Sequence, residues 1–376
     1  MSSGDAPCKF NIPVKLPVKA LRCAGALLLP AVFAAAVHAA PPQFSQVKPD
    51  TPLVFPQDTG AHPDYRTEWW YVTGWLDTPD HKPLGFQVTF FRSATTHDAA
   101  NPSQFAPRQL IIAHAALSDP ALGKLQHAQK SAREGFGLAF AKVGNTDVKL
   151  DNWRMVRDAG GRYDTDVVTQ DYHLHLSLQP TQTMLLEGDH GFSRKGPHLG
   201  HASYYYSEPH LQVSGTLTRQ GRAQPVHGTA WLDHEWSSQV LDAEASGWDW
   251  TGINLDDGAS LMAFQIRDTS GVKLWAHATM RDTNGRTAQF AEDQVSFTPV
   301  RTWRSPRTNT AYPVATRILI GSTNWELAPL QDDQELDSRL STGAVYWEGA
   351  VRALRDGREA GRGYLELTGY VDRLKL

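Results

Sequence analysis

Apolar and polar positions alternate along much of this 376-residue chain. Residues 84–92 alternate apolar with polar positions, and residues 68–76 are rich in aromatic and β-branched side chains without helical periodicity. Both stretches predict strands, and residues 77–82 between them predict a turn. Only residues 131–140 have a weak helical pattern. Further strands are predicted at residues 110–118, 172–179 and 211–219.

This pattern predicts an all-β protein. Short strands follow one another at regular intervals, with loop sequences such as residues 158–162 and 187–191 between them. Such spacing is typical of antiparallel barrels and sandwiches. The chain has 12 tryptophans and 11 tyrosines, which favours closed barrels wide enough to need bulky side chains or a ligand inside.

The pattern of the first predicted strand is repeated later in the chain. Residues 69–77 resemble residues 248–256, and each copy is followed by a strand that ends in arginine, Arg92 and Arg267. Two similar barrels in tandem would produce this repeat, although any hairpin of a tryptophan-rich β protein draws on the same residue types. The expected organisation is a signal peptide (1–40), an extended lead-in (41–62), an N-terminal barrel (63–240) and a C-terminal barrel (241–376).

The first forty residues have the pattern of a secretory leader. Four basic residues precede an apolar run at 24–37, and small residues follow it at the expected cleavage positions. The run is shorter than the roughly 20 residues of a spanning helix, and Pro30 interrupts it. We therefore expect cleavage near Ala39 or Ala40, a periplasmic or secreted product, and no stable membrane insertion afterwards.

Composition narrows the chemistry further. Both cysteines, Cys8 and Cys23, lie in the leader, so the mature protein should have no disulfide, no thiolate nucleophile and no cysteine–metal site. The net charge is -4, and removing the leader, with four basic residues and one acid, leaves -7. This acidity argues against nucleic acid or an anionic membrane surface as a partner.

Residues 229–238 carry the densest chemistry of the chain. Asp233 and Glu235 flank His234, and indoles lie on both sides, including Trp236. Carboxyl groups held against apolar walls have raised pKa values and become proton donors. In a strand, however, Asp233 and Glu235 point to one face and His234 and Trp236 to the other. The stretch is therefore either part of a catalytic cavity or a buried hydrogen-bond network at the join of two domains.

Other candidates combine acids, histidine and aromatic residues. Asp249 lies between Trp248 and Trp250, and is the fourth catalytic candidate beside Asp233, His234 and Glu235. Each of these side chains has an alternative role in a core or at a solvated edge. The candidates for substrate binding are Trp70, His114, Tyr205, Trp236, Trp248 and Trp250.

Several mechanisms lack support. His173 and His175 alternate on one strand, but no zinc-site spacing is met, so we expect no metal. There is no Gly-x-Ser-x-Gly elbow and no glycine-rich nucleotide fingerprint. We therefore expect neither a serine nucleophile nor a cofactor.

Seven motifs in order resemble the AttH-like proteins, from about residue 52 to the C-terminus. They are EWWYVTG (68–74), GFQVTFFR (85–92), AHAALSD (113–119), ASYYYS (202–207), DHEWSS (233–238), GWDW (247–250) and GYLELTGY (363–370). That family is often labelled as secreted hydrolases and is grouped with the carotenoid 1,2-hydratases. The resemblance implies two lipocalin-like barrels, secretion and an association with an ABC transporter, while the hydratase relatives add water to a polyene double bond without a cofactor.

Two functions follow as hypotheses. One is a cofactor-free hydratase that binds an elongated apolar isoprenoid or lipid in its interior and uses Asp233, His234, Glu235 and Asp249 as acids and bases. The other is a non-catalytic carrier or chaperone that passes an apolar ligand to an ABC transporter. The direction in which Asp233, Glu235 and Asp249 point distinguishes them, because acids turned away from every cavity cannot catalyse.

Overall fold

The computed structural model describes residues 44–97 and 101–374. The expected signal peptide and both cysteines lie outside the described residues. Among the residues that are described, no helix is both long and apolar enough to cross a membrane. The protein is all-β, with two short 3-10 turns, η1 (Gln57–Thr59) and η2 (Glu292–Gln294).

The strands form two antiparallel sheets. The first contains β1 (Thr67–Asp77), β2 (Pro83–Ala94), β3 (Gln109–Asp119), β4 (Lys124–Arg133), β5 (Ala139–Ala141), β6 (Asp147–Leu150), β7 (Trp153–Arg157), β8 (Tyr163–Val168), β9 (His173–Gln179), β10 (Leu185–Leu186), β11 (Phe192–Arg194), β12 (Ala202–Arg219) and β13 (Arg222–Gln239). The second contains β14 (Ala245–Leu255), β15 (Ser260–Asp268), β16 (Lys273–Arg281), β17 (Thr287–Phe290), β18 (Val295–Arg304), β19 (Ala311–Ile320), β20 (Thr323–Pro329), β21 (Glu335–Asp337), β22 (Val345–Arg355) and β23 (Arg358–Leu367).

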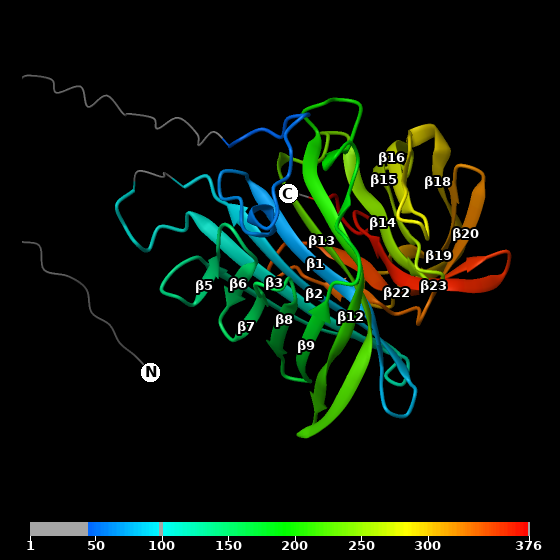
Figure 1. Cartoon of the computed structure of the whole chain (residues 1–376), viewed down its shortest axis with the longest axis horizontal. Coiled ribbons are helices and arrows are strands. Elements are labelled where there is room, and N and C mark those ends of the chain that lie inside the picture. The colour runs from blue at the N-terminus through cyan, green and yellow to red at the C-terminus, as the bar shows by residue number, and fades with distance from the viewer. Residues whose placement is uncertain (1–43, 98–100, 375–376) are drawn as a thin grey trace, which may run out of the picture. The chain divides into compact units, whose positions relative to one another are not determined.

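The two sheets have the same connectivity. In the first, β1 lies between β2 and β13, and in the second, β14 lies between β15 and β23, so each opening strand pairs with the last strand of its sheet (Figure 1). Short strands add to β12 in the first sheet and to β22 in the second. The register also agrees, because Arg92 lies opposite Glu68 and Arg267 lies opposite Gly247. The repeat in the sequence therefore reflects two equivalent lipocalin-like barrels.

Each barrel is filled by its own side chains. Inward-facing residues of the first sheet, such as Trp70, Phe90 and Trp236, form one buried cluster, and residues such as Trp325 and Trp347 form a second in the other barrel. A third cluster lies on the outward faces that the two sheets turn toward each other, and includes Trp75 and Trp250. The interior of a barrel is therefore a packed core, and the contact between the barrels is a separate apolar layer.

The helix suggested for residues 131–140 is wrong. This segment contains the end of β4, a turn and the start of β5. Gly135, Phe136 and Gly137 have positive φ values of 144°, 55° and 69°, which a right-handed helix does not contain. The apparent helical period came from two strand ends that are joined by this turn.

Trp75 tests the layer between the sheets. Its indole Nε1 donates a 2.9 Å hydrogen bond to the Gly363 carbonyl of the other sheet, and its side chain is buried. Trp75→Phe removes this hydrogen bond and part of the buried indole surface, so the free energy of unfolding should fall by about 1–3 kcal/mol in urea titrations. Trp303→Phe, at a half-buried site on β18, is the matched control and should change stability less. Equal losses in the two variants would contradict this role of Trp75.

Candidate functional site

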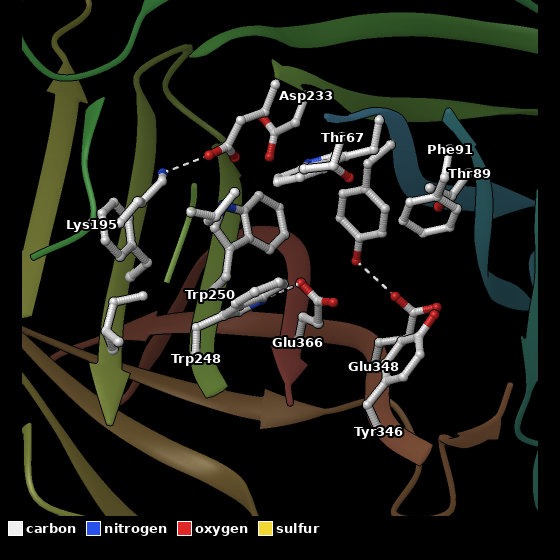
Figure 2. A pocket seen from close by; sticks show the side chains of 16 residues that line it. Thr67, Thr89, Phe91, Lys195, Asp233, Trp248, Trp250, Tyr346, Glu348 and Glu366 are labelled. Carbon is white, nitrogen blue, oxygen red and sulfur yellow. Dashed lines mark hydrogen bonds and ion pairs between the residues drawn. The ribbon is translucent and has the colours of Figure 1, made fainter. Parts of the chain in front are cut away.

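A pocket lies between the two barrels, on the faces that the sheets turn toward each other. It contains about 760 Å³ of empty space, part of which opens to solvent. Figure 2 shows aromatic rings around most of it and carboxyl groups in two places. Its lining residues are Thr67, Trp69, Tyr71, Thr89, Phe91, Lys195, Asp233, Glu235, Val240, Trp248, Trp250, Phe264, Ile266, Tyr346, Glu348 and Glu366.

The two barrels contribute equivalent positions to this pocket. In β1, Trp69 and Tyr71 point into it, and the corresponding residues of β14 are Trp248 and Trp250. The neighbouring strands repeat this correspondence, because Thr89 lies opposite Tyr71 just as Phe264 lies opposite Trp250. Alternation explains the arrangement, since every second residue of these strands fills its own barrel and the others face the second barrel.

Asp233 and Glu235 of β13 both line the pocket, and His234 and Trp236 point to the opposite side, as strand alternation predicts. Cross-strand pairing places Asp233 beside Tyr71 and Glu235 beside Trp69. Both acids are buried, with 3% and 6% of their surface exposed. The acids and the histidine of this stretch therefore belong to two different environments.

Asp233 accepts three hydrogen bonds. Oδ1 receives Ser207 Oγ and Trp231 Nε1, each at 2.6 Å, and Oδ2 receives the Tyr205 hydroxyl at 2.7 Å. Tyr205 in turn accepts a 3.0 Å hydrogen bond from Trp250 Nε1. Burial raises the pKa of Asp233 to about 7, although these donors oppose the shift by stabilising the carboxylate.

Glu348 and Glu366 are the second pair of carboxyl groups that line the pocket. They are directly opposite each other on β22 and β23 and share the pocket face. Glu348 Oε2 accepts the Tyr71 hydroxyl at 3.0 Å, and Glu366 Oε2 accepts Trp248 Nε1 at 2.8 Å (Figure 2). Glu348 Oε1 has no hydrogen-bond partner among the described residues.

Two adjacent buried carboxyl groups do not both ionise at neutral pH. Burial, followed by the charge of Glu366, raises the pKa of Glu348 well above its usual range. Burial also raises the pKa of Glu366, to about 7. The pair therefore holds one proton near neutral pH, with Glu348 as the neutral acid and Glu366 as the member that ionises first.

Lys195 is the cation of the pocket. Its Nζ forms a 2.9 Å ion pair with Glu235 Oε1 and lies over the rings of Tyr205 and Phe264, at 4.7 and 4.4 Å from their centroids. This ion pair neutralises the charge of Glu235, one of the four carboxyl groups that line the pocket. The remaining groups make the pocket favour a neutral or cationic molecule over an anionic one.

Two other candidates, Asp249 and His114, lie away from the pocket. Asp249 faces into the second barrel, where it accepts Gln265 Nε2 at 2.6 Å and pairs with Arg267 at 3.0 Å. Its neighbours Trp248 and Trp250 line the pocket because adjacent residues of a strand point to opposite faces. His114 is buried behind the wall, with Nδ1 2.9 Å from the Tyr346 hydroxyl.

Trp70, His234 and Trp236 belong to a buried charge network inside the first barrel. Glu68 Oε1 accepts His62 Nδ1 at 2.7 Å and His234 Nε2 at 2.9 Å, and Oε2 accepts Arg92 Nε at 2.7 Å. The Trp236 ring stacks on His62 at 3.8 Å, and the Trp70 ring stacks on His234 at 4.7 Å. These aromatic residues therefore pack against the network and do not line the pocket.

His62, Glu68 and His234 also form a possible metal-ligand set, because one atom of each lies within 4.8 Å of the others. Two histidines and a carboxylate are ligands that zinc accepts. Here, however, the three side chains bond directly to one another, and Arg92 occupies the second carboxylate oxygen. The donor set is satisfied as an ion-pair network and fits that role better than a metal centre.

Sequence reasoning missed several pocket residues. Lys195 lies in a loop, where nothing in the sequence shows its burial. Glu348 and Glu366 are 18 positions apart and meet only through the pairing of β22 with β23. The usable signal was strand alternation. Glu366 lies on the same strand face as Tyr364, two residues earlier, and the other face of this strand is leucine-rich.

Comparison with known proteins agrees with the fold and the motifs. The model of the AttH-like family matches residues 46–370. The chain belongs to the AttH-like family. A crystal structure of a Nitrosomonas europaea protein provisionally assigned to AttH is 62% identical, covers 87% of this chain and 100% of its own, and has a TM-score of 0.83. Among proteins of curated function, none matches this AttH-like chain.

This AttH-like protein also shares its fold with an enzyme. Kievitone hydratase from Nectria haematococca is 14% identical, with a TM-score of 0.66 over 88% of this chain and 96% of the hydratase chain. At this identity the likeness shows a common two-barrel architecture, and the chemistry of the site has to be argued from its own residues.

The buried acids predict how stability depends on pH. Folded pKa values of about 7 for Asp233 and Glu366, above 3.8 and 4.5, mean that the folded state binds more protons than the unfolded state between about pH 4.5 and 7. The free energy of unfolding should therefore fall as pH rises through this window. Glu348→Gln should reduce the fall by about 1 kcal/mol or more, measured by urea titrations at pH 5 and 8.5.

The control for that measurement is Glu326→Gln, because Glu326 is an exposed glutamate on β20. It should keep the wild-type pH dependence. A Glu348→Gln protein with the same decline as the wild type would show that Glu348 ionises normally in the folded state.

Glu68 tests the charge network of the first barrel. Glu68→Gln removes the negative partner of the buried Arg92 guanidinium. We expect a loss of about 3–5 kcal/mol in the free energy of unfolding at pH 7, because an unpaired buried charge remains. Thermal and urea unfolding would measure it, and a loss below about 1 kcal/mol would contradict this role.

Proposed function

We propose that the protein is a cofactor-free hydratase that adds water to, or removes it from, a carbon–carbon double bond of an apolar molecule held between the barrels. The observation that carries this proposal is the buried carboxyl of Glu348, whose Oε1 has no hydrogen-bond partner among the described residues and lies in an indole-lined pocket. Protonation of an alkene needs a general acid that is still protonated at neutral pH and is shielded from water, and a buried carboxyl with a raised pKa meets both conditions.

The proton balance follows from the Glu348–Glu366 pair. Glu348 transfers its proton to one alkene carbon, the π electrons form the new C–H bond, and a cation develops on the other carbon. The ionised Glu366 takes a proton from a water molecule while the oxygen of that water molecule bonds to the cationic carbon. The product is an alcohol, and passing the proton from Glu366 to Glu348 restores the starting state without a cofactor.

The walls of the pocket suit a transient cation. The indoles of Trp248 and Trp250 and the ring of Phe91 line it, and the negative faces of aromatic rings attract positive charge. Asp233 adds a carboxylate on the facing wall, held in place by three donors. A neutral apolar substrate is favoured over an anionic one, because the carboxyl groups outnumber Lys195.

The substrate class is an isoprenoid or lipid alkene. Because both barrel interiors are filled by their own cores, we propose the space between the barrels as the binding site, in place of a barrel interior. The cavity volume is about 90 Å³, below the range of typical ligand pockets, so the pocket is suited to a small molecule or to one end of a longer chain.

Water labelled with ¹⁸O tests this function. The purified protein is incubated with an acyclic carotenoid, or with a total lipid extract, and products are followed by mass spectrometry. We expect an alcohol that carries ¹⁸O from the wild type, and a loss of at least about 100-fold in its rate for Glu348→Gln. Glu326→Gln, at an exposed site, should retain full activity.

The same experiment distinguishes the carrier. A ligand that co-purifies and is released unchanged from both wild type and Glu348→Gln would contradict the hydratase and support an apolar-ligand carrier. Activity in Glu348→Gln equal to that of the wild type would remove Glu348 from the mechanism.

A further inference from the structure

Ser207 lies between two buried carboxyl groups. Its Oγ is 2.6 Å from Asp233 Oδ1 and 2.9 Å from Glu187 Oε1. Glu187 and Ser207 have no exposed surface, and Asp233 has 3%. The chain Glu187–Ser207–Asp233 therefore leads from a fully buried acid to a carboxyl group on the pocket wall.

Counting hydrogens constrains this chain. A serine hydroxyl carries one hydrogen and can donate to one of the two carboxyl oxygens, while its lone pairs can only accept from the other. If both acids were ionised, one carboxylate would face the lone pairs of Ser207 at hydrogen-bond distance without a hydrogen between them. A buried acceptor left in this state is costly, so one of the two acids carries a proton.

We propose that Glu187 and Asp233 share a single proton through Ser207, and that Glu187 is a positioning residue that sets the charge of the pocket carboxyl group Asp233. The sharing of the proton stands on the geometry alone. Its role in catalysis rests on the proposed function of the pocket.

The other contacts decide where the proton resides. Asp233 also accepts hydrogen bonds from Trp231 and Tyr205, which stabilise its carboxylate. Glu187 Oε1 accepts from Ser207 and Oε2 has no hydrogen-bond partner among the described residues, and the Thr279 hydroxyl only partly opposes the burial that raises the pKa of Glu187. Glu187 is therefore the protonated member, in agreement with burial raising its pKa to about 8 and that of Asp233 to about 7.

Charged groups from the neighbouring elements act on both acids. Lys195 and Arg281 favour ionisation of Glu187, and Asp233 opposes it. Glu235 raises the pKa of Asp233, and Asp233 raises that of Glu366. The state of Glu187 thus bears on the pocket mainly through Asp233, to which Ser207 connects it.

The chain also lets the proton move. Glu187 gives its proton to Ser207 Oγ while Ser207 gives its own hydrogen to Asp233 Oδ1, so that Glu187 becomes ionised and Asp233 neutral. No proton enters or leaves, and the hydroxyl of Ser207 is restored with reversed orientation. A buried pocket carboxyl group can change between base and acid in this way without exchange with solvent.

Infrared difference spectroscopy of the full chain tests the shared proton without any substrate, so its failure is distinguishable from failure of the hydratase. Protein labelled with ¹³C in the glutamate side-chain carboxyl group is titrated between pH 5 and 10. Glu187, Glu348 and Glu366 should each lose a proton within this range, and the signal that titrates near pH 8 should be absent in Glu187→Gln. A set of glutamate signals that is unchanged in Glu187→Gln would overturn the assignment.

Asp233→Asn and Ser207→Ala separate the relay from simple charge repulsion. Asp233→Asn removes the charge of Asp233, so the titration midpoint of Glu187 should fall by at least one pH unit while Ser207 is present. In the Ser207→Ala background the same substitution should lower this midpoint by less than half as much. Ser207→Thr, which keeps the hydroxyl, should restore the full shift. An equal shift with serine and with alanine would overturn the role of Ser207, and urea unfolding of each variant confirms that it is folded.

Discussion

The packing of β1 and β13 against β14 and β23 removes water from a surface on which four carboxyl groups point inward. Ionised carboxylates lose their hydration there, so the acids hold protons at a pH at which exposed acids would not. Each barrel has its own filled interior, so the side chains on the facing outer surfaces are left to form the pocket. The pocket is a property of the contact between two complete folds.

The two barrels place residues at equivalent strand positions around the pocket. The positions at which the two barrels carry different residue types account for the proposed chemistry. Asp233 lies opposite Tyr71 in the first barrel as Glu366 lies opposite Trp250 in the second. One strand further, Ser207 pairs with Asp233 and Glu348 pairs with Glu366. Equivalent positions thus hold a hydroxyl in one barrel and a carboxyl in the other. The first arrangement supports a proton relay to Glu187, and the second supports an adjacent acid and base.

The opposite faces of the same strands carry the structural charges. Arg92 pairs with Glu68 inside the first barrel, and the equivalent Arg267 pairs with Asp249 inside the second. Both ion pairs are buried and have further hydrogen-bond partners, which is the condition under which a buried charge is tolerated. His234 and Asp249, adjacent in sequence to pocket residues, belong to these interior networks.

Local pattern in the sequence determined the all-β class, most strand positions, the repeat of the first strand and the separation of Asp233 and Glu235 from His234 and Trp236. These features depend on alternation within single strands, which is a property of neighbouring residues. Which face of each strand met the other barrel, and which acids lay side by side, was decided by the tertiary structure alone. Glu348, Glu366, Glu187 and Ser207 come from distant strands and loops, and their protonation depends on burial that arises only when the two barrels pack together.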